Sequence, residues 1–253
     1  MHSIGQYYCF MRLTSLLIAA LIAASCGPCG PVLAQDAVVH VTALRNPASW
    51  PYDPFRAGLD AFEEHRHLAP KSELHFHLVP NDPGLALDNV QIVIEHGDQR
   101  LVLDAEKTSF VLPRLTRYDP DDAVLSVNKH QDLFDQHWPT AAVRTPGLSS
   151  HVLRIGDLRL ACQVNMAILK KNLGFWESAA LSVMAGQRDW CVVGRHGGQS
   201  VRAPFAFQAV TFHDGDRTER RTWPTPQLSL SLPSDQHGWS DGTLIEFDAV
   251  PAN

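Results

Sequence analysis

Apolar and polar positions alternate along most of the chain. The alternation is clearest at residues 73–79 (ELHFHLV) and returns at residues 89–95 and 243–249. Because neighbouring side chains of a strand point to opposite faces, this pattern is typical of strands with one buried face. Weaker forms of it predict further strands at residues 37–44, 100–104, 109–113, 123–127, 151–155, 206–213, 219–223 and 227–232. The chain is therefore predicted to be mainly β, with an α+β fold as the alternative.

A short helix is predicted after the proline-rich segment 46–54, which is read as a rigid loop. Asp53 can accept a hydrogen bond at the N-cap, and Pro54 suits the first helical position. Phe55, Leu59 and Phe62 then define one apolar face. We expect this helix to end near residue 65.

A second helical pattern follows a segment that alternates like a strand, residues 158–162. Apolar residues then recur every three or four positions, at Met166, Leu169, Leu173, Trp176, Ala180 and Met184. This spacing predicts a helical insert at residues 165–185 with Asn165 as its N-cap. Gly174 lies inside the pattern and could divide the insert into two short helices.

Two further segments are predicted to lack regular structure. Residues 132–146 contain Trp138-Pro139 and Thr145-Pro146, and a residue before proline disfavours helical backbone. Residues 195–200 are rich in glycine. Both are read as loops.

The first 34 residues are predicted to be a signal peptide. Arg12 precedes an apolar core at residues 16–25, which is too short to span a bilayer, and Val32-Leu33-Ala34 fits a cleavage site. The alternatives are a start at Met11, and lipoprotein processing at Cys26 after a partial lipobox. Export to the periplasm or beyond the cell is the expectation.

The position of the signal peptide decides how the cysteines are interpreted. Cys26 and Cys29 have the spacing of a redox motif, but both lie in the segment that cleavage would remove. Cys162 and Cys191 then remain, and an even count in an oxidising compartment favours one disulfide. The alternative is two buried thiols.

An imperfect repeat suggests two lobes joined by the helical insert. Residues 89–103 and 207–223 each hold an alternating segment, a Gly-Asp turn and a return segment, and each is followed by a Leu-Pro step and a final strand. We expect two β-sandwich-like lobes, at residues 35–150 with one short helix and at residues 151–253 with the insert. Coincidence in a hairpin-rich chain is the alternative explanation.

Charge excludes some partners. The chain carries a formal net charge of −6, with acidic and basic residues mixed along its length. Nucleic acids and anionic membrane surfaces attract clustered positive charge, so neither is an expected partner. Beyond the signal peptide, no apolar run is long enough to predict a transmembrane span.

The strongest metal candidates are His75 and His77 among 13 histidines. Two residues apart on a strand, their side chains share a face, which is a spacing that can hold a metal. No third ligand follows at a recognisable spacing. A half-exposed strand face that happens to carry histidine is the favoured interpretation, so no metal or other cofactor is predicted.

Catalytic signals are weak. His237, Ser240 and Asp241 are close in sequence, but a catalytic triad is assembled from separate elements, so their proximity is no sign of one. Asp119, Asp121 and Asp122 lack the spacing of a calcium loop. No catalytic residue is predicted.

The tryptophans Trp50, Trp138 and Trp223 each precede a proline. Exposed aromatic residues in such loops could bind glycans or a partner surface. The competing interpretation is that they cap the open ends of β-sandwiches.

Three segments carry a resemblance to a known group: LRIGDLRLACQV at residues 153–164, DWC at 189–191 and WSDGTLIEF at 239–247. With them the chain resembles a group of uncharacterised exported proteins of proteobacteria. The resemblance implies an exported location and a fold, and it assigns no activity to any residue.

From these observations we expect an exported, non-enzymatic binding or accessory module with an unidentified envelope partner or ligand. The alternative is an envelope hydrolase or metal-dependent enzyme that uses the His-rich strand face.

Overall fold

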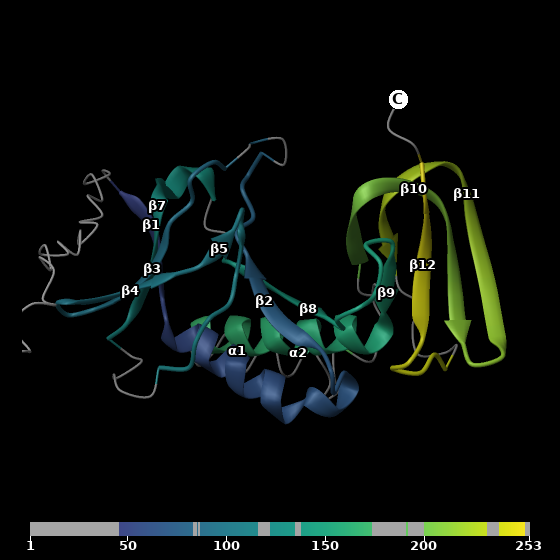
Figure 1. The fold of residues 1–253 in the computed structure, drawn as a ribbon, viewed down its shortest axis with the longest axis horizontal. Coiled ribbons are helices and arrows are strands. Elements are labelled where there is room, and N and C mark those ends of the chain that lie inside the picture. Colours follow the sequence, from purple (N-terminus) through teal and green to yellow (C-terminus); the bar gives the residue numbers. More distant parts are fainter. Residues whose placement is uncertain are drawn as a thin grey trace, which may run out of the picture. The chain divides into compact units, whose positions relative to one another are not determined.

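The computed structural model describes residues 46–82, 85, 87–115, 122–134, 138–173, 191, 200–231 and 238–250. Across them run three four-stranded antiparallel sheets and two α-helices, which confirms the mainly β prediction (Figure 1). The predicted signal peptide, the strand at 37–44 and the glycine-rich loop at 195–199 lie outside the described residues.

Each sheet mixes strands that are distant in sequence. The first has the order β1 (Pro47–Pro51), β7 (Val124–His130), β3 (Ile92–His96) and β4 (Gln99–Leu103). The second has the order β5 (Ala105–Glu106), β6 (Ser109–Phe110), β2 (Glu73–His77) and β8 (Thr140–Arg144). The third has the order β11 (Arg217–Ser231), β10 (Ser200–Asp214), β12 (Leu244–Ala249) and β9 (Val152–Arg154).

The two helices pack against each other. The helix α1 (Asp53–Glu64) occupies the predicted position, but the predicted N-cap is wrong. Tyr52 is the N-cap, and Asp53 is the first helical residue, whose carboxylate accepts from Arg56. Gly58 faces Ile168 of α2 (Ile155–Asn172), and a β-carbon there would lie 2.8 Å from that side chain. The absent side chain therefore lets the helices approach closely. Lys171 adds an ion pair to Asp53 at 2.8 Å.

Two hydrophobic cores organise the chain. The first gathers residues of the first two sheets and of both α-helices, and Phe55, Phe76 and Phe110 are fully buried in it. The second gathers residues of the third sheet around Phe207 and Phe212, together with Ile155 at the start of α2. The 3₁₀ helices Arg66–Leu68 and Gln131–Leu133 lie in connections.

The first and third sheets repeat one topology. In each, a helix follows an edge strand directly (β1–α1, β9–α2), a hairpin follows later (β3–β4, β10–β11), and the last strand inserts between them (β7, β12). The registers agree as well. In the first sheet, Val124 pairs with Glu95, which lies two residues before the turn glycine Gly97. In the third sheet, Leu244 pairs with His213, which lies two residues before the turn glycine Gly215.

The pairings of the edge strands also correspond. Pro51 of β1 pairs with Val124, the first residue of β7, and Arg154 of β9 pairs with Leu244, the first residue of β12. The repeat suggested by the sequence is therefore present in the strand topology of both halves.

The predicted start of the helical insert is wrong. Residues 158–162 were expected as a strand and Asn165 as an N-cap, whereas α2 begins at Ile155 and Asn165 lies within it. Its buried stripe runs through Leu160, Val164 and Ile168 at intervals of four, a helical spacing that the short alternation masked. Residues 174–185 of the predicted insert lie outside the described residues.

Three smaller predictions are corrected. The segment 46–54 was expected to be a rigid loop, but Pro47–Pro51 form β1, which pairs with β7. The segment 132–146 was expected to be a loop, but it contains β8, which pairs with β2 in full register from Thr140 to Arg144. The segments 219–223 and 227–232 were expected as separate strands, but residues 217–231 form the single strand β11. Prolines at 224 and 226 suggested the interruption, and they mark a bulge instead.

Candidate functional site

The candidate site lies where β10 loses register with both of its neighbours. Against β11, Phe207 pairs with Gln227 and Ala209 with Thr222, so the four residues 223–226 oppose the single residue Gln208. Against β12, Phe207 pairs with Ala249 and Ala209 with Asp248, so Gln208 has no partner there. Bulges of this kind redirect side chains and are frequent beside functional sites.

The sequence of the β11 bulge explains why the ladder breaks. Residues 223–226 read Trp-Pro-Thr-Pro, and the two prolines have no N–H to donate to a neighbouring strand. Gln227 closes the bulge by donating from its side-chain amide to the carbonyl oxygen of Thr225 at 2.9 Å. The local chemistry thus favours a bulge over a regular hairpin.

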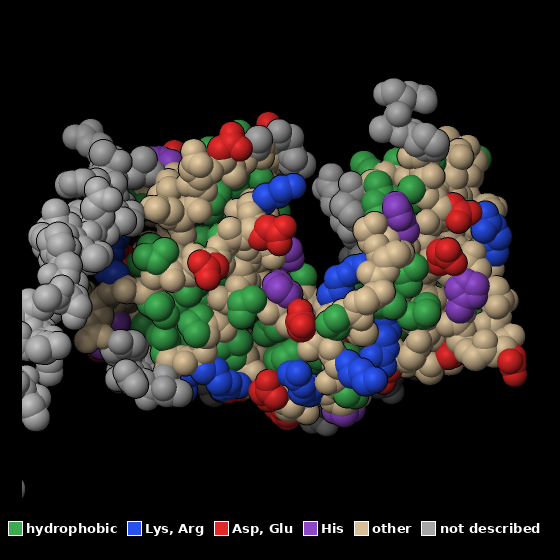
Figure 2. All heavy atoms as spheres, viewed as in Figure 1, with side chains coloured by type: hydrophobic (Ala, Val, Ile, Leu, Met, Phe, Trp, Pro, Cys, Tyr) green, Lys and Arg blue, Asp and Glu red, His purple; other side chains and the backbone are tan. Residues whose placement is uncertain are grey.

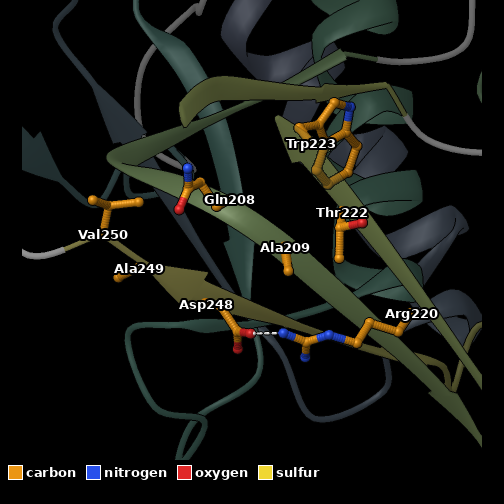
Figure 3. A pocket seen from close by; sticks show the side chains of 8 residues that line it. All are labelled: Gln208, Ala209, Arg220, Thr222, Trp223, Asp248, Ala249 and Val250. Carbon is orange, nitrogen blue, oxygen red and sulfur yellow. Dashed lines mark hydrogen bonds and ion pairs between the residues drawn. The ribbon is translucent and has the colours of Figure 1, made fainter. Parts of the chain in front are cut away.

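A depression of about 390 Å³ opens at these bulges, and we call it the bulge hollow. Figure 3 shows side chains of three adjacent strands around it. They are Gln208, Ala209, Arg220, Thr222, Trp223, Asp248, Ala249 and Val250.

An ion pair crosses β10 on one side of the hollow. Arg220 of β11 donates to the carboxylate of Asp248 on β12, as Figure 3 shows, and it also donates to the hydroxyl of Thr211 at 3.2 Å. Both charged side chains are about half exposed, at 54% and 47%. Such a pair contributes little to stability, but its two charges offset each other beside the hollow.

Trp223 joins the hollow to the second core. It is partly buried and meets the ring of Phe207 edge to face, with centroids 5.6 Å apart. Gln208 and Thr222 are exposed. An amide and a hydroxyl can each donate and accept, so the hollow offers an aromatic surface together with versatile hydrogen-bonding groups.

The predicted metal candidates share one face of β2. The His75 Nε2 atom lies 3.6 Å from a carboxylate oxygen of Glu73. Burial, with a smaller contribution from nearby His75, lowers the pKa of His77 below its ordinary value, because both disfavour the charged imidazolium. Among the described residues, no three His, Cys, Asp or Glu side chains are grouped so that they could hold a metal.

Ser240 and Asp241 have different partners. The Ser240 hydroxyl donates to Asp214, and Asp241 forms an ion pair with Arg159. Together they tie the loop before β12 to β10 and to α2. His237, Asp119 and Asp121 lie outside the described residues, and Asp122 is exposed at the start of the segment that leads into β7.

Two tryptophans are buried, Trp50 within strand β1 and Trp239 in the segment before β12. Trp50 packs edge to face on Phe134, and Trp239 stacks on Phe212 beneath the guanidinium of Arg217, which lies 3.7 Å from the ring centroid. Trp138 is partly buried against Phe55. Trp223 differs from these three because it lines the bulge hollow.

Cys162 and Cys191 form a disulfide, as predicted, with their Cα atoms 5.5 Å apart. Within the described residues, no helix is both long and apolar enough to cross a membrane. Acidic and basic side chains are interspersed over the face seen in Figure 2.

No family model matches the chain, and the searches of curated proteins and of solved structures return no match either.

The sequence interpretation missed the bulge hollow. The Trp-Pro-Thr-Pro segment was interpreted as a gap between two strands, and Trp223 within it as one of three aromatic residues that could bind glycans or a partner surface. The available signal was the continuation of strand-like residues on both sides of it, which fits one bulged strand as well as two separate ones.

Proposed function

We propose that the chain is an exported, non-enzymatic binding module of the cell envelope, and that it binds its ligand in the bulge hollow. The observation that carries this proposal is the loss of both β10 ladders at Gln208. That break brings side chains from three strands to one depression. Its carboxylate is held in an ion pair with Arg220, an arrangement that suits recognition better than proton transfer.

Three observations support the exported location. The disulfide is typical of oxidising compartments, the first 34 residues have the pattern of a signal peptide, and the quoted segments resemble exported proteobacterial proteins. Sequencing the amino terminus of the protein recovered from the envelope tests this directly. A mature chain beginning at Gln35 is the expected result, and an intact amino terminus on protein found in the cytoplasm would contradict it.

The binding proposal is tested by comparing what three immobilised proteins retain from envelope extract. They are the wild type, the double variant Gln208→Ala/Thr222→Ala, and the control His213→Ala/Glu246→Ala. The control removes another polar contact between β10 and β12, in which His213 Nε2 and a carboxylate oxygen of Glu246 lie 3.4 Å apart outside the hollow. We expect a component that the wild type and the control retain and the hollow variant loses.

Identical retention by all three proteins would contradict the proposal. So would turnover of an envelope substrate that His75→Ala/His77→Ala abolishes, because that result would favour the hydrolase or metal-dependent alternative.

A further inference from the structure

We infer that the ligand of the bulge hollow is a neutral glycan chain, an inference that rests on the proposed binding function.

Charge argues against an ionic ligand. Arg220 and Asp248 are the charged side chains that line the hollow, and they already neutralise each other. An anion that approached Arg220 would be repelled by the neighbouring Asp248, and a cation that approached Asp248 would be repelled by Arg220. A ligand without net charge meets neither cost.

Strand topology argues against a peptide bound by strand addition. That mode needs an exposed sheet edge with unpaired backbone groups. The hollow lies across β10, which has β11 on one side and β12 on the other, and in the β11 bulge beside it Pro224 and Pro226 have no N–H to donate. A peptide added as a further strand would therefore meet an interrupted row of backbone donors at the β11 edge beside the hollow.

The polarity of the lining argues against an apolar ligand. Trp223 and Val250 are the large apolar side chains of the hollow, while Gln208, Thr222 and the ion pair supply its polar groups. A purely apolar molecule would strip water from these groups without replacing their hydrogen bonds.

A sugar ring satisfies the combination that remains. Its hydroxyl groups both donate and accept, so they can bond the amide of Gln208, the hydroxyl of Thr222 and the outer oxygens and nitrogens of the ion pair. Its C–H face can lie on an indole, which Trp223 provides. Because Gln208, Thr222, Arg220 and Asp248 are all exposed, the hollow is open to solvent and can receive an internal unit of a chain.

The test is calorimetric titration of the processed, disulfide-bonded protein with soluble hexasaccharides. The probes are linear chains of β-1,4-glucose, α-1,4-glucose, β-1,4-mannose and β-1,4-N-acetylglucosamine. We expect at least one to bind, and we expect Gln208→Ala/Thr222→Ala to weaken its binding about tenfold or more. Trp223→Ala should weaken it further, and His213→Ala/Glu246→Ala should leave it unchanged.

Trp223 also contacts the core, so circular dichroism and thermal unfolding of Trp223→Ala accompany the titration. The exposed pair Gln208 and Thr222 keeps the test decisive if that variant unfolds. Absence of binding by every saccharide at about 10 mM, or binding that the Gln208→Ala/Thr222→Ala variant retains, would overturn the inference. If the hollow still governed retention of an envelope component in that case, the binding function would stand and only the glycan would be rejected.

Discussion

Gly156 lies at the start of α2, where two parts of the chain meet its backbone. Its N–H donates to the carbonyl oxygen of Asp241 at 2.9 Å. A β-carbon at this position would lie 2.1 Å from the carbonyl oxygen of Leu68 and 2.8 Å from that of Asp241. Both obstacles are backbone atoms, so neither can move aside as a flexible side chain would.

We therefore expect Gly156→Ala to lower the free energy of unfolding by at least about 2 kcal/mol, through overpacking against backbone. Gly242→Ala is the matched control, because its β-carbon would meet only the hydroxyl of Ser240 at 3.5 Å. Urea unfolding of the two variants makes the comparison. Equal stabilities would show that the contact at Gly156 relaxes without cost.

Asp157 is a buried carboxylate beside that glycine, with only 3% of its surface exposed. It accepts hydrogen bonds from the backbone N–H and the hydroxyl of Thr145, at 2.7 and 2.8 Å. Burial nevertheless raises the pKa of Asp157 above its ordinary value, because the hydrogen bonds and nearby arginines offset only part of the desolvation.

A raised pKa means that the folded state binds a proton more tightly than the unfolded chain. The resulting stability is fully present below the ordinary aspartate pKa and is lost as pH rises through the folded one. As pH rises from about 3.5 to 7, the free energy of unfolding should therefore fall less in Asp157→Asn than in the wild type. Denaturant unfolding across that range measures the difference, and parallel profiles of the two proteins would contradict the expectation.

At the scale of elements, α2 protects a free edge of the second sheet. Asn165 presents its side-chain amide to β8 as a neighbouring strand would. Its oxygen accepts from the N–H of Ala141 at 2.9 Å, and its nitrogen donates to the Ala141 carbonyl oxygen at 3.0 Å. One side chain thus satisfies both backbone groups of an edge residue, which would otherwise be unpaired.

Replacing Asn165 with alanine should cost about 2 kcal/mol of unfolding free energy, because a donor and an acceptor in a partly buried place lose their partner. Asn172→Ala is the matched control, since that asparagine is exposed in the last turn of the same helix. Amide exchange at Ala141 should accelerate in Asn165→Ala alone. A variant with unchanged exchange at Ala141 would contradict the edge-capping role.

These elements show where sequence reasoning succeeds and where it stops. The helix α1 and the strands β2 and β12 follow local signals, a proline start or a clean alternation, and they were predicted nearly to the residue. The strand β8 was missed because its prolines flank it rather than interrupt it. The bulge hollow depends on the register of three strands, and a register set by long-range pairing cannot be derived from one segment.

At the scale of the whole molecule, the disulfide links two separate elements of the chain and the repeated topology relates its two halves. The disulfide joins positions 29 residues apart, from the middle of α2 to Cys191. Both cysteines were predicted from count and compartment alone. The repeat was visible as two Gly-Asp turns, and the strand registers on either side of each turn agree.

Removing the disulfide with Cys162→Ser/Cys191→Ser should lower the free energy of unfolding by about 3.6 kcal/mol, the chain-entropy value for a loop of this length. Guanidinium unfolding of this variant and of the wild type with and without a reductant checks the value. The reduced wild type should match the variant, and a midpoint insensitive to reduction would contradict the prediction.

The break at residues 223–226 has a further consequence for behaviour at high concentration. The strand β11 is the outermost strand of its sheet and runs for fifteen residues. A long, regular edge strand of that kind can pair with a strand of another molecule and so begin a fibril. Two prolines interrupt its row of donors, and charged residues occupy much of its first half, so the feature that shapes the hollow also discourages self-association.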